Sequence, residues 1–561
     1  MISNIALRFG AGEDQPPLVI GVTPITVFVG PNNSGKSKAL REIEAYCRKT
    51  MGQASDVILG SLEFEPLSRE EIEIEISKIE QTPNVGEVVH PGYVILGKLN
   101  PQDNKMFRQQ VDKRGLINEA QTPNQRQGHY ASFLYAYTVR MDGTNRLGLL
   151  REQDAGDLQA TPSNHLTHLF IDNALRAEVR RIIFDAFKKH FVLDPTNIGK
   201  LRVRLSDRAP ADESEEKGWD ARAVSFHRQA VEVANASDGV KAFAGIVTTI
   251  LAGDPKIALI DEPEAFLHPA LSNKLGMEVA RALQGSKRRL FVATHSSSFL
   301  MGCIQSGSPL NIVRLTYNYA NPTARILPKE KILSLMRNPL LRSTGVLNGL
   351  FYESVIVTES DADRAFYQEI NERLLAADDS RGISSCLFIN AQNKQTVWDI
   401  VRPLRELGIP ALGIVDMDAI KDGGQVWTKL LEGAFLPVAS HPPLHAQRQA
   451  INALFVASGR DMARDGGIAL LAGQDKEACQ NLLSQLAEYG VLLVPSGELE
   501  AWLKQVGAAG HGPKWLIEMF ERMGDGPGDA NYLRPSDGDV WDFIGSAKFW
   551  LTNAERKGIP K

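Results

Sequence analysis

The sequence predicts an α/β protein with two parallel sheets, and two observations carry this prediction. An apolar, β-branched run at 25–29 leads into a glycine-rich loop and then into a helical pattern at 38–46. From residue 354 onward, apolar runs alternate with helical patterns, at 354–358, 361–375, 386–389, 393–407 and 411–415. Alternation of this length is typical of parallel strands that are joined by crossover helices.

Composition limits the class of protein. The 561 residues are enough for three or four domains, or for two large ones. Hydrophobic residues make up 43% and charged residues 23%, which excludes disorder as the main state. The net charge of −5 excludes a basic nucleic-acid coat, so a nucleic-acid site must be local or must use metal ions. Four scattered cysteines and no long apolar run predict a cytoplasmic protein without a membrane segment.

The first strand leads into a phosphate-binding loop. Residues 30–37 read Gly-Pro-Asn-Asn-Ser-Gly-Lys-Ser and match the pattern G-x-x-x-x-G-K-[ST] in full. Glycines let backbone N–H groups approach phosphates, Lys36 supplies a compact positive charge, and the Ser37 hydroxyl can bind Mg²⁺. We therefore expect ATP and Mg²⁺ to be held by Gly30, Asn32, Asn33, Ser34, Gly35, Lys36 and Ser37.

Two later apolar runs end in further candidates for the same site. The run 257–260 leads into Asp261 and Glu262, and the run 290–293 leads into Thr294 and His295. Asp261 can reach the Mg²⁺ ion, and Glu262 is placed to polarise an attacking water. The alternatives are a helix N-cap for the acidic pair and a structural hydrogen bond for His295.

A long insertion must separate the P-loop from Asp261. A helical stretch at about 160–225 is rich in Arg and Lys, and it predicts a dimerisation arm, a DNA-contacting face or a solvated helix surface. The alternation of Glu and Ile from Glu71 to Ser77 predicts a strand with one solvated face. Residues from 80 to 130 are rich in Pro, Asn, Gln and Gly and predict loops with short strands.

Acidic residues follow two strands of the second series. Glu359 and Asp363 come after the strand 354–358, and Asp416 and Asp418 come after the strand 411–415. The carboxyl ends of parallel strands form the edge at which sites of α/β sheets lie. Carboxylates there are hard ligands for Mg²⁺ or Mn²⁺, and two such ions can clamp a phosphodiester. Solvated turns are the alternative for either acidic group alone.

The motifs of the first half resemble the ABC-type ATPase heads of the RecF and SMC kind. The resemblance rests on the P-loop, Ile260–Pro263, Ser237-Asp238-Gly239 and His295. It implies that Ser237 and Gly239 belong to a degenerate signature loop, which covers the nucleotide of a second subunit in a head-to-tail homodimer. It also implies that His295 senses the γ-phosphate.

The motifs of the second half resemble a TOPRIM domain, a Rossmann-like fold marked by a Glu after its first strand and Asp-x-Asp after its third. An ATPase head followed by TOPRIM is the layout of the OLD (overcoming lysogenization defect) nucleases, which Gabija and retron-associated nucleases share. Family members often read Glu-Gly-Pro-x-Asp where this chain has Glu-Ser-Asp-Ala-Asp at 359–363.

The OLD resemblance implies an ATP-gated, Mg²⁺- or Mn²⁺-dependent DNA endonuclease or nickase in anti-phage defence. It implies a homodimer through the heads or a higher oligomer, and a defence-system partner protein or RNA. It implies that Glu359, Asp363, Asp416 and Asp418 bind metal, with Ser496 and with Glu498 or Glu500. A late lysine, matched here by Lys548, would stabilise charge on the scissile phosphate.

These predictions divide the chain into an ATPase head at 1–345 and a TOPRIM domain with a C-terminal helical extension at 346–561. A RecF-like repair ATPase that binds DNA without cutting it is one alternative. A sensor or scaffold that acts through a toxin or an RNA is another. A topoisomerase would need a catalytic tyrosine, which no pattern around the tyrosines suggests.

Overall fold

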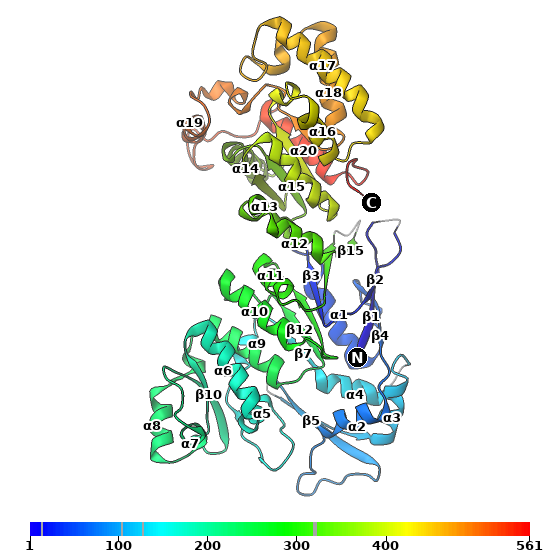
Figure 1. Ribbon diagram of the computed structural model, residues 1–561, viewed down its shortest axis with the longest axis vertical. Helices are drawn as coiled ribbons and strands as arrows, with labels where there is room; N and C mark the ends of the chain where they lie inside the picture. The colour runs from blue at the N-terminus through cyan, green and yellow to red at the C-terminus, as the bar shows by residue number, and fades with distance from the viewer. Residues whose placement is uncertain (13–14, 102–104, 126–127, 318–321, 561) are drawn as a thin grey trace. The chain divides into compact units, whose positions relative to one another are not determined.

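The computed structural model describes residues 1–12, 15–101, 105–125, 128–317 and 322–560. It forms two compact units, Met1–Lys329 and Glu330–Lys561 (Figure 1). The division falls before the boundary expected at 345, because most of α12 (Lys329–Arg337) and all of α13 (Pro339–Ser343) belong to the second unit, together with the 3₁₀ segment Val346–Phe351. A Cβ on Gly349 of that segment would lie 3.1 Å from side-chain atoms of both Val355 and Leu404. No helix in the described ranges is long and apolar enough to cross a membrane.

A six-stranded sheet forms the centre of the first unit. The strand order is β15 (Thr323–Leu327), β14 (Leu310–Thr316), β3 (Ile25–Val29), β13 (Arg289–Ala293), β12 (Ile257–Asp261) and β7 (Thr138–Met141). Neighbouring strands are parallel except for the β14–β15 pair. Every residue of β3 is buried, as its β-branched composition predicts. The carboxyl ends of β3, β13 and β12 therefore meet at one edge.

Helices and a second sheet complete this part of the first unit. The helices are α1 (Lys36–Lys49), α9 (Asp238–Ala252), α10 (Pro269–Ala282) and α11 (Ser297–Gln305). The second sheet is antiparallel and has the order β2 (Val19–Gly21), β1 (Ile2–Leu7) and β4 (Leu59–Phe64). Apolar residues of both sheets and of α1 share one core.

The prediction of a strand at 71–77 is wrong, because Arg69–Ser77 is a helix, α2. Ser68 and Glu71 form a reciprocal capping box at its start. Ile72 and Ile76 are buried on one face, while Ile74 between them is exposed. Alternation of Glu and Ile fits both a period of two and a spacing of four, and the cap decides in favour of the helix.

The segment from 80 to 130 is more regular than its composition predicts. Its elements are the antiparallel pair β5 (Tyr93–Asn100) and β6 (Lys105–Asp112), and the helices α3 (Lys113–Gln121) and α4 (Gly128–Tyr137).

The insertion near 160–225 is part helix and part sheet. Its helices are α5 (His165–Ile171), α6 (Asn173–Phe187), α7 (Glu213–Lys217) and α8 (Ala221–Gln229), the last of which runs past residue 225. Its strands β9 (His190–Asp194) and β10 (Lys200–Ser206) join a sheet with β8 (Gln153–Asp154) and β11 (Val231–Glu232), which flank the insertion. Many of its basic side chains are paired within the insertion. Arg176 and Arg180 both bind the buried Glu216, and Arg202 and Arg204 both bind the buried Asp194.

The second unit contains the expected parallel sheet. Its order is β17 (Cys386–Asn390), β16 (Ser354–Thr358), β18 (Ala411–Val415) and β19 (Val491–Leu493), and all three pairs are parallel. The crossover helices are α14 (Asp361–Ala376) and α15 (Lys394–Glu406). The later helices are α16 (Gly424–Gly433), α17 (His441–Ser458), α18 (Gly473–Ala487), α19 (Pro513–Met523) and α20 (Asp539–Thr552). The late tryptophans Trp502, Trp515, Trp541 and Trp550 are buried in its core.

Candidate functional site

The P-loop lies between the end of β3 and the start of α1. Gly30, Asn33 and Gly35 have φ angles of 144°, 60° and 91°, which favour glycine. A Cβ on Gly30 would lie 2.0 Å from the Leu315 carbonyl oxygen, so this position accepts only glycine. Gly35 is the N-cap of the 14-residue α1, so the loop ends at a helix N-terminus, which is a favourable place for phosphate.

The Lys36 ammonium lies within this loop. Its Nζ donates to the carbonyl oxygens of Gly30 at 2.9 Å and Pro31 at 2.6 Å, and contacts Ser34 Oγ at 3.2 Å. Burial lowers the pKa of Lys36 to about 8. Asn32 and Asn33 are exposed at the tip of the loop. The lysine is thus placed where phosphate oxygens can replace its carbonyl partners.

Ser37 and Asp261 form the expected pair for an Mg²⁺ ion. Ser37 Oγ donates to Asp261 Oδ1 at 2.8 Å. Burial raises the pKa of Asp261, and the neighbouring charge of Glu262 raises it further. A cation between the hydroxyl and the carboxylate would oppose both effects, so these residues fit the ion.

Arg146 supports this edge of the sheet, and the sequence interpretation missed it. Its fully buried guanidinium donates to the carbonyl oxygens of Asp142, Asp261 and Glu262. It therefore fixes the backbone of Asp261, the predicted Mg²⁺ ligand, and of Glu262, the predicted catalytic acid. A lone arginine at the start of a short 3₁₀ helix, Arg146–Gly148, forms no sequence pattern, so no signal could have identified it.

Glu262, Glu264 and His295 form the rest of the site. Glu262 has a φ of 52°, and its half-exposed carboxylate lies 3.9 Å from His295 Nε2. Glu264, which the sequence analysis did not identify, accepts hydrogen bonds from Thr294 Oγ1 and from the His295 N–H, both at 2.7 Å. Burial, and then the nearby Lys36 charge, lower the pKa of His295 to about 4, so its ring is neutral at pH 7.

The signature candidates lie at the start of α9. Ser237 is the N-cap residue, and a Cβ on Gly239 would lie 2.8 Å from the Phe266 carbonyl oxygen. In the described part of the chain no hydrogen bond joins Ser237 or Gly239 to the P-loop. The structure therefore brings together the P-loop, Asp261, Glu262 and His295, and no described hydrogen bond links Ser237 or Gly239 to these residues.

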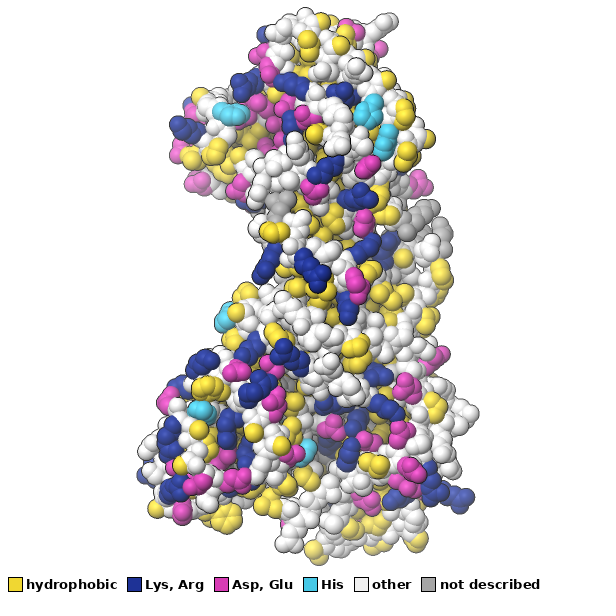
Figure 2. Space-filling view, viewed as in Figure 1, with side chains coloured by type: hydrophobic (Ala, Val, Ile, Leu, Met, Phe, Trp, Pro, Cys, Tyr) yellow, Lys and Arg dark blue, Asp and Glu magenta, His cyan; other side chains and the backbone are white. Residues whose placement is uncertain are grey.

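A second group of acids lies at the carboxyl edge of the sheet in the second unit. The Asp416 N–H donates to Glu359 Oε1 at 2.8 Å, which joins the residues that follow β18 and β16. Asp363 is buried in the first turn of α14, where it forms a capping box with Ser360. Ser360, which stands where the resembling family has glycine, thus orients Asp363. Figure 2 shows acidic side chains gathered on this unit between α17 and α19.

These carboxyl groups destabilise one another in their charged forms. Burial and the neighbouring Asp418 and Asp363 raise the pKa of Glu359 to about 8. Burial and the charge of Glu359 raise the pKa of Asp416 to about 9. The pKa of Asp363 is also raised, by burial first. A divalent cation would relieve this repulsion, and an all-oxygen donor set suits Mg²⁺ or Mn²⁺.

The late candidates lie on the loop after β19. The Met417 N–H donates to the Gly497 carbonyl oxygen at 2.8 Å, so this loop lies beside Asp416. Ser496 Oγ is buried and has no hydrogen-bond partner among the described residues, as a missing ligand would leave it. Glu500 Oε1 accepts from the Gly512 N–H at 2.6 Å and lies 2.8 Å from His511 Nδ1. Glu498 lies nearby, since Glu498, Glu500 and His511 can each offer one ligand atom within 4.8 Å of the others.

The structure does not bring Lys548 to the carboxylates. Its Nζ donates to the Ser380 carbonyl oxygen at 2.6 Å, beyond the carboxyl end of α14. The acids lie at the other end of this helix, whose 16 residues span roughly 24 Å. Lys394 at the start of α15 contacts Asp418 at 3.0 Å and Asp422 at 2.9 Å instead. Its position after β17, at the same sheet edge, was a signal that could have identified it.

Three comparisons relate the chain to known proteins. Among solved structures, the chain is similar to an SMC head bound to the C-winged helix domain of ScpA, at 14% sequence identity. The match covers 59% of this chain and 99% of that chain, with a TM-score of 0.35. It is similar to the SMC head domain from Thermotoga maritima, with 14% identity, coverage of 58% and 98%, and a TM-score of 0.27. An SMC head with an extended coiled coil, bound to the C-terminal domain of ScpA derived from Pyrococcus furiosus, matches with 11% identity, coverage of 60% and 98%, and a TM-score of 0.33.

A comparison with curated proteins finds no match. Residues 149–301 match a protein family described as "AAA domain, putative AbiEii toxin, Type IV TA system". This stretch contains the residues that follow β12 and β13, and the P-loop described above lies beside them. The first unit thus contains a P-loop ATPase domain of the AAA kind, and ATP with Mg²⁺ are the ligands that such a domain binds.

Proposed function

We propose that this protein is an ATP-gated, metal-dependent DNA endonuclease. One observation carries the proposal: carboxylates from three neighbouring strand ends of the second unit meet at one edge of a parallel sheet. They are close enough to raise the pKa values of Glu359 and Asp416 to about 8 and 9. Buried acids that repel one another are costly for a fold, and they are typical of sites that bind cations.

Glu359, Asp363, Asp416 and Asp418 would hold Mg²⁺ or Mn²⁺, with Ser496 and Glu498 on the facing loop. When bound, the ions supply a nucleophilic water and positive charge at a phosphodiester. The chain's own residues orient this set: the Asp416 N–H holds the Glu359 carboxylate, and Ser360 holds Asp363. Lys394 pairs with Asp418 and adds a positive charge at the edge that DNA phosphates would approach.

In the first unit, Glu262 would orient the water that attacks ATP, and neutral His295 would contact the γ-phosphate as a hydrogen-bonding group. A second copy would supply Ser237 and Gly239 in a head-to-tail homodimer, by the resemblance to ABC-type heads. ATP binding would then set the dimer state and, through it, access to the carboxylates. Higher oligomers and a defence-system protein or RNA partner remain part of this proposal.

A plasmid-nicking assay with Mg²⁺ or Mn²⁺, with and without ATP, tests both activities. We expect Asp416→Asn to abolish nicking while ATP hydrolysis persists. The exposed Asp475 of α18 gives the matched control, Asp475→Asn, which should nick at the wild-type rate. Nicking that survives Asp416→Asn would contradict the nuclease assignment and favour the RecF-like alternative.

The gating proposal is tested in the same assay with Lys36→Ala. This variant should lose ATP hydrolysis and the response of nicking to ATP. The exposed Lys49 on the same helix gives the control Lys49→Ala, which should keep both. A nicking rate that ignores both ATP and Lys36→Ala would contradict gating.

The matched family's description names a toxin of a toxin–antitoxin system, and this favours a role in bacterial defence. Expression of the wild type in bacteria should slow growth or reduce phage plaque counts. If the second unit is the effector, Asp416→Asn should lose this protection. If Asp416→Asn protects fully and Lys36→Ala does not, the chain acts as an ATPase sensor through another effector.

A further inference from the structure

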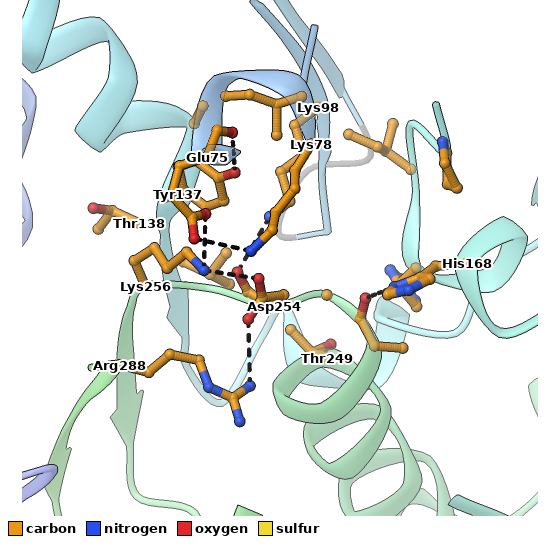
Figure 3. Close-up of a pocket in the computed structure, with 18 of the residues that line it drawn as sticks. Glu75, Lys78, Lys98, Tyr137, Thr138, His168, Thr249, Asp254, Lys256 and Arg288 are labelled. Carbon is orange, nitrogen blue, oxygen red and sulfur yellow. Dashed lines mark hydrogen bonds and ion pairs between the residues drawn. The ribbon is translucent and has the colours of Figure 1, made fainter. Parts of the chain in front are cut away.

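A cavity of about 840 Å³ lies in the first unit, away from the P-loop. Its wall includes Thr138 at the start of β7, Lys256 just before β12, and Arg288 just before β13 (Figure 3). These residues lie at the amino edge of the six-stranded sheet, whereas the ATP site follows the carboxyl ends of the same strands. A strand of five residues such as β12 spans about 16 Å, so the cavity is separate from the ATP site.

Positive side chains outnumber negative ones around this cavity. Five basic side chains line it, namely Lys78, Lys98, Lys256, Lys287 and Arg288, together with three acids, Glu71, Glu75 and Asp254. Each of the three acids already forms an ion pair with at least one of these basic side chains. Lys256 Nζ lies 3.0 Å from Glu75 and 2.9 Å from Asp254, and Lys78 also contacts Glu75 at 2.9 Å. A net positive charge therefore faces the cavity.

Lys98 is the basic residue with the weakest partners. It extends from β5 toward Asp254, where its Nζ lies 3.5 Å from the backbone oxygen and 4.4 Å from the centre of the Tyr137 ring (Figure 3). Within the described ranges no carboxylate forms an ion pair with it. Burial lowers the pKa of Lys98 to about 8. The nearest carboxylates, Asp254 and Glu75, already pair with Lys256, Arg288 and Lys78. An anion in the cavity would therefore give the desolvated Lys98 ammonium a partner of its own.

Apolar and aromatic side chains form another part of the wall, beside polar ones such as Asn164, His168 and Thr249. Phe107 and Tyr135, whose ring centres are 5.0 Å apart, line it together with Ile74, Ile79 and Leu99. Small-molecule sites of a few hundred to about 1,000 Å³ combine such walls with a few convergent polar groups. Phosphate oxygens would satisfy Lys98, and a planar ring fits beside the aromatic pair.

We propose that this cavity binds a nucleotide, held through its phosphate by Lys98 and Lys78, at a site separate from the ATP site of the P-loop. Nucleoside monophosphates are the smallest nucleotides that combine a phosphate group for the lysines with a planar base for the aromatic pair. The proposal goes beyond the nuclease function and does not depend on it.

Calorimetric titration of the full-length chain with AMP tests this site. The Lys36→Ala variant is the background, because it removes phosphate binding at the P-loop. AMP should bind this variant with one site per chain. Adding Lys98→Met should weaken binding about tenfold, the size expected for the loss of a charge-assisted hydrogen bond. Lys113→Met, outside the cavity, should leave the affinity unchanged.

Lys78→Met removes a second cation from the wall and provides an independent variant if Lys98→Met does not fold. It should also weaken AMP binding. Absence of AMP binding in the Lys36→Ala background overturns the proposal. An AMP affinity that neither Lys98→Met nor Lys78→Met lowers below that of this background also overturns it. Binding of inorganic phosphate or pyrophosphate without AMP would overturn the assignment to a nucleotide.

Discussion

The backbone N–H of Asp416 donates a hydrogen bond of 2.8 Å to the carboxylate of Glu359. The two residues follow adjacent parallel strands, β18 and β16, and both carboxyl groups have pKa values raised to about 8 or 9. This hydrogen bond holds the buried carboxyl group of Glu359 close to Asp416. Without a cation, the two groups therefore cannot both be charged at neutral pH without cost.

The stability of the metal-free protein should fall as the pH rises from 6 to 9. A carboxyl with a raised pKa in the folded state binds its proton more tightly there than in the unfolded chain. Its contribution to the free energy of unfolding is therefore lost between the unfolded pKa of about 4 and the folded values of about 8 and 9. Thermal unfolding in EDTA measures this fall.

The Asp416→Asn variant provides the comparison for this pH profile. It should flatten the profile, because one of the two repelling groups no longer ionises. Excess Mg²⁺ or Mn²⁺ should raise the wild-type melting temperature most at pH 9. A melting temperature that changes equally with pH in the wild type and in Asp416→Asn would show that this pair does not control it.

Glu498 should bind the metal more strongly than Glu500. The Glu500 carboxylate already has partners in the Gly512 N–H and in His511, and these hold it in place. Glu498→Gln should weaken Mn²⁺ binding roughly 10–100-fold, and Glu500→Gln should weaken it less while lowering the melting temperature. Calorimetric titration with Mn²⁺ separates the two. The reverse order of affinities would assign the metal to Glu500.

Lys394, and not Lys548, should affect DNA cleavage. Lys394 contacts Asp418 and Asp422 at the sheet edge, whereas Lys548 contacts Ser380 at the other end of α14. Lys394→Ala should reduce the nicking rate by roughly tenfold or more, because it removes a charge beside the attacked phosphate. Lys548→Ala, as the matched control, should nick at nearly the wild-type rate. A large effect of Lys548→Ala alone would show that α20 reaches the site in the active state.

Arg146 should be needed for ATP hydrolysis although it lies outside every motif. Its buried guanidinium binds the backbone oxygens of Asp261 and Glu262. Arg146→Met leaves these oxygens unsatisfied, which should cost about 3 kcal/mol of unfolding free energy. It should also lower kcat more than it raises KM. Urea unfolding and steady-state ATPase assays measure both, with the exposed Arg151→Met as control.

Much of the framework was predictable because its signals are local. The strands at 25–29, 354–358 and 411–415 appear where their apolar runs predicted them. The helix α2 was misread because alternating Glu and Ile satisfies two periods at once, and only the contacts of Ser68 with Glu71 distinguish them. The residues Arg146 and Glu264 were not identified, because their partners lie on other elements. Lys394 was overlooked although it follows β17 at the same sheet edge as the acids.

Local sequence patterns were enough to predict the P-loop, the acids at the strand ends and the alternation of strands and helices from 354 to 415. These depend on the conformational preferences of neighbouring residues, which act over a few positions. The long-range contacts show which acids meet, that Ser360 orients Asp363, that Lys394 lies at the cluster, and that Lys548 does not. Distances between such side chains follow from the order of strands in the sheet and from helix length, and no local preference encodes them.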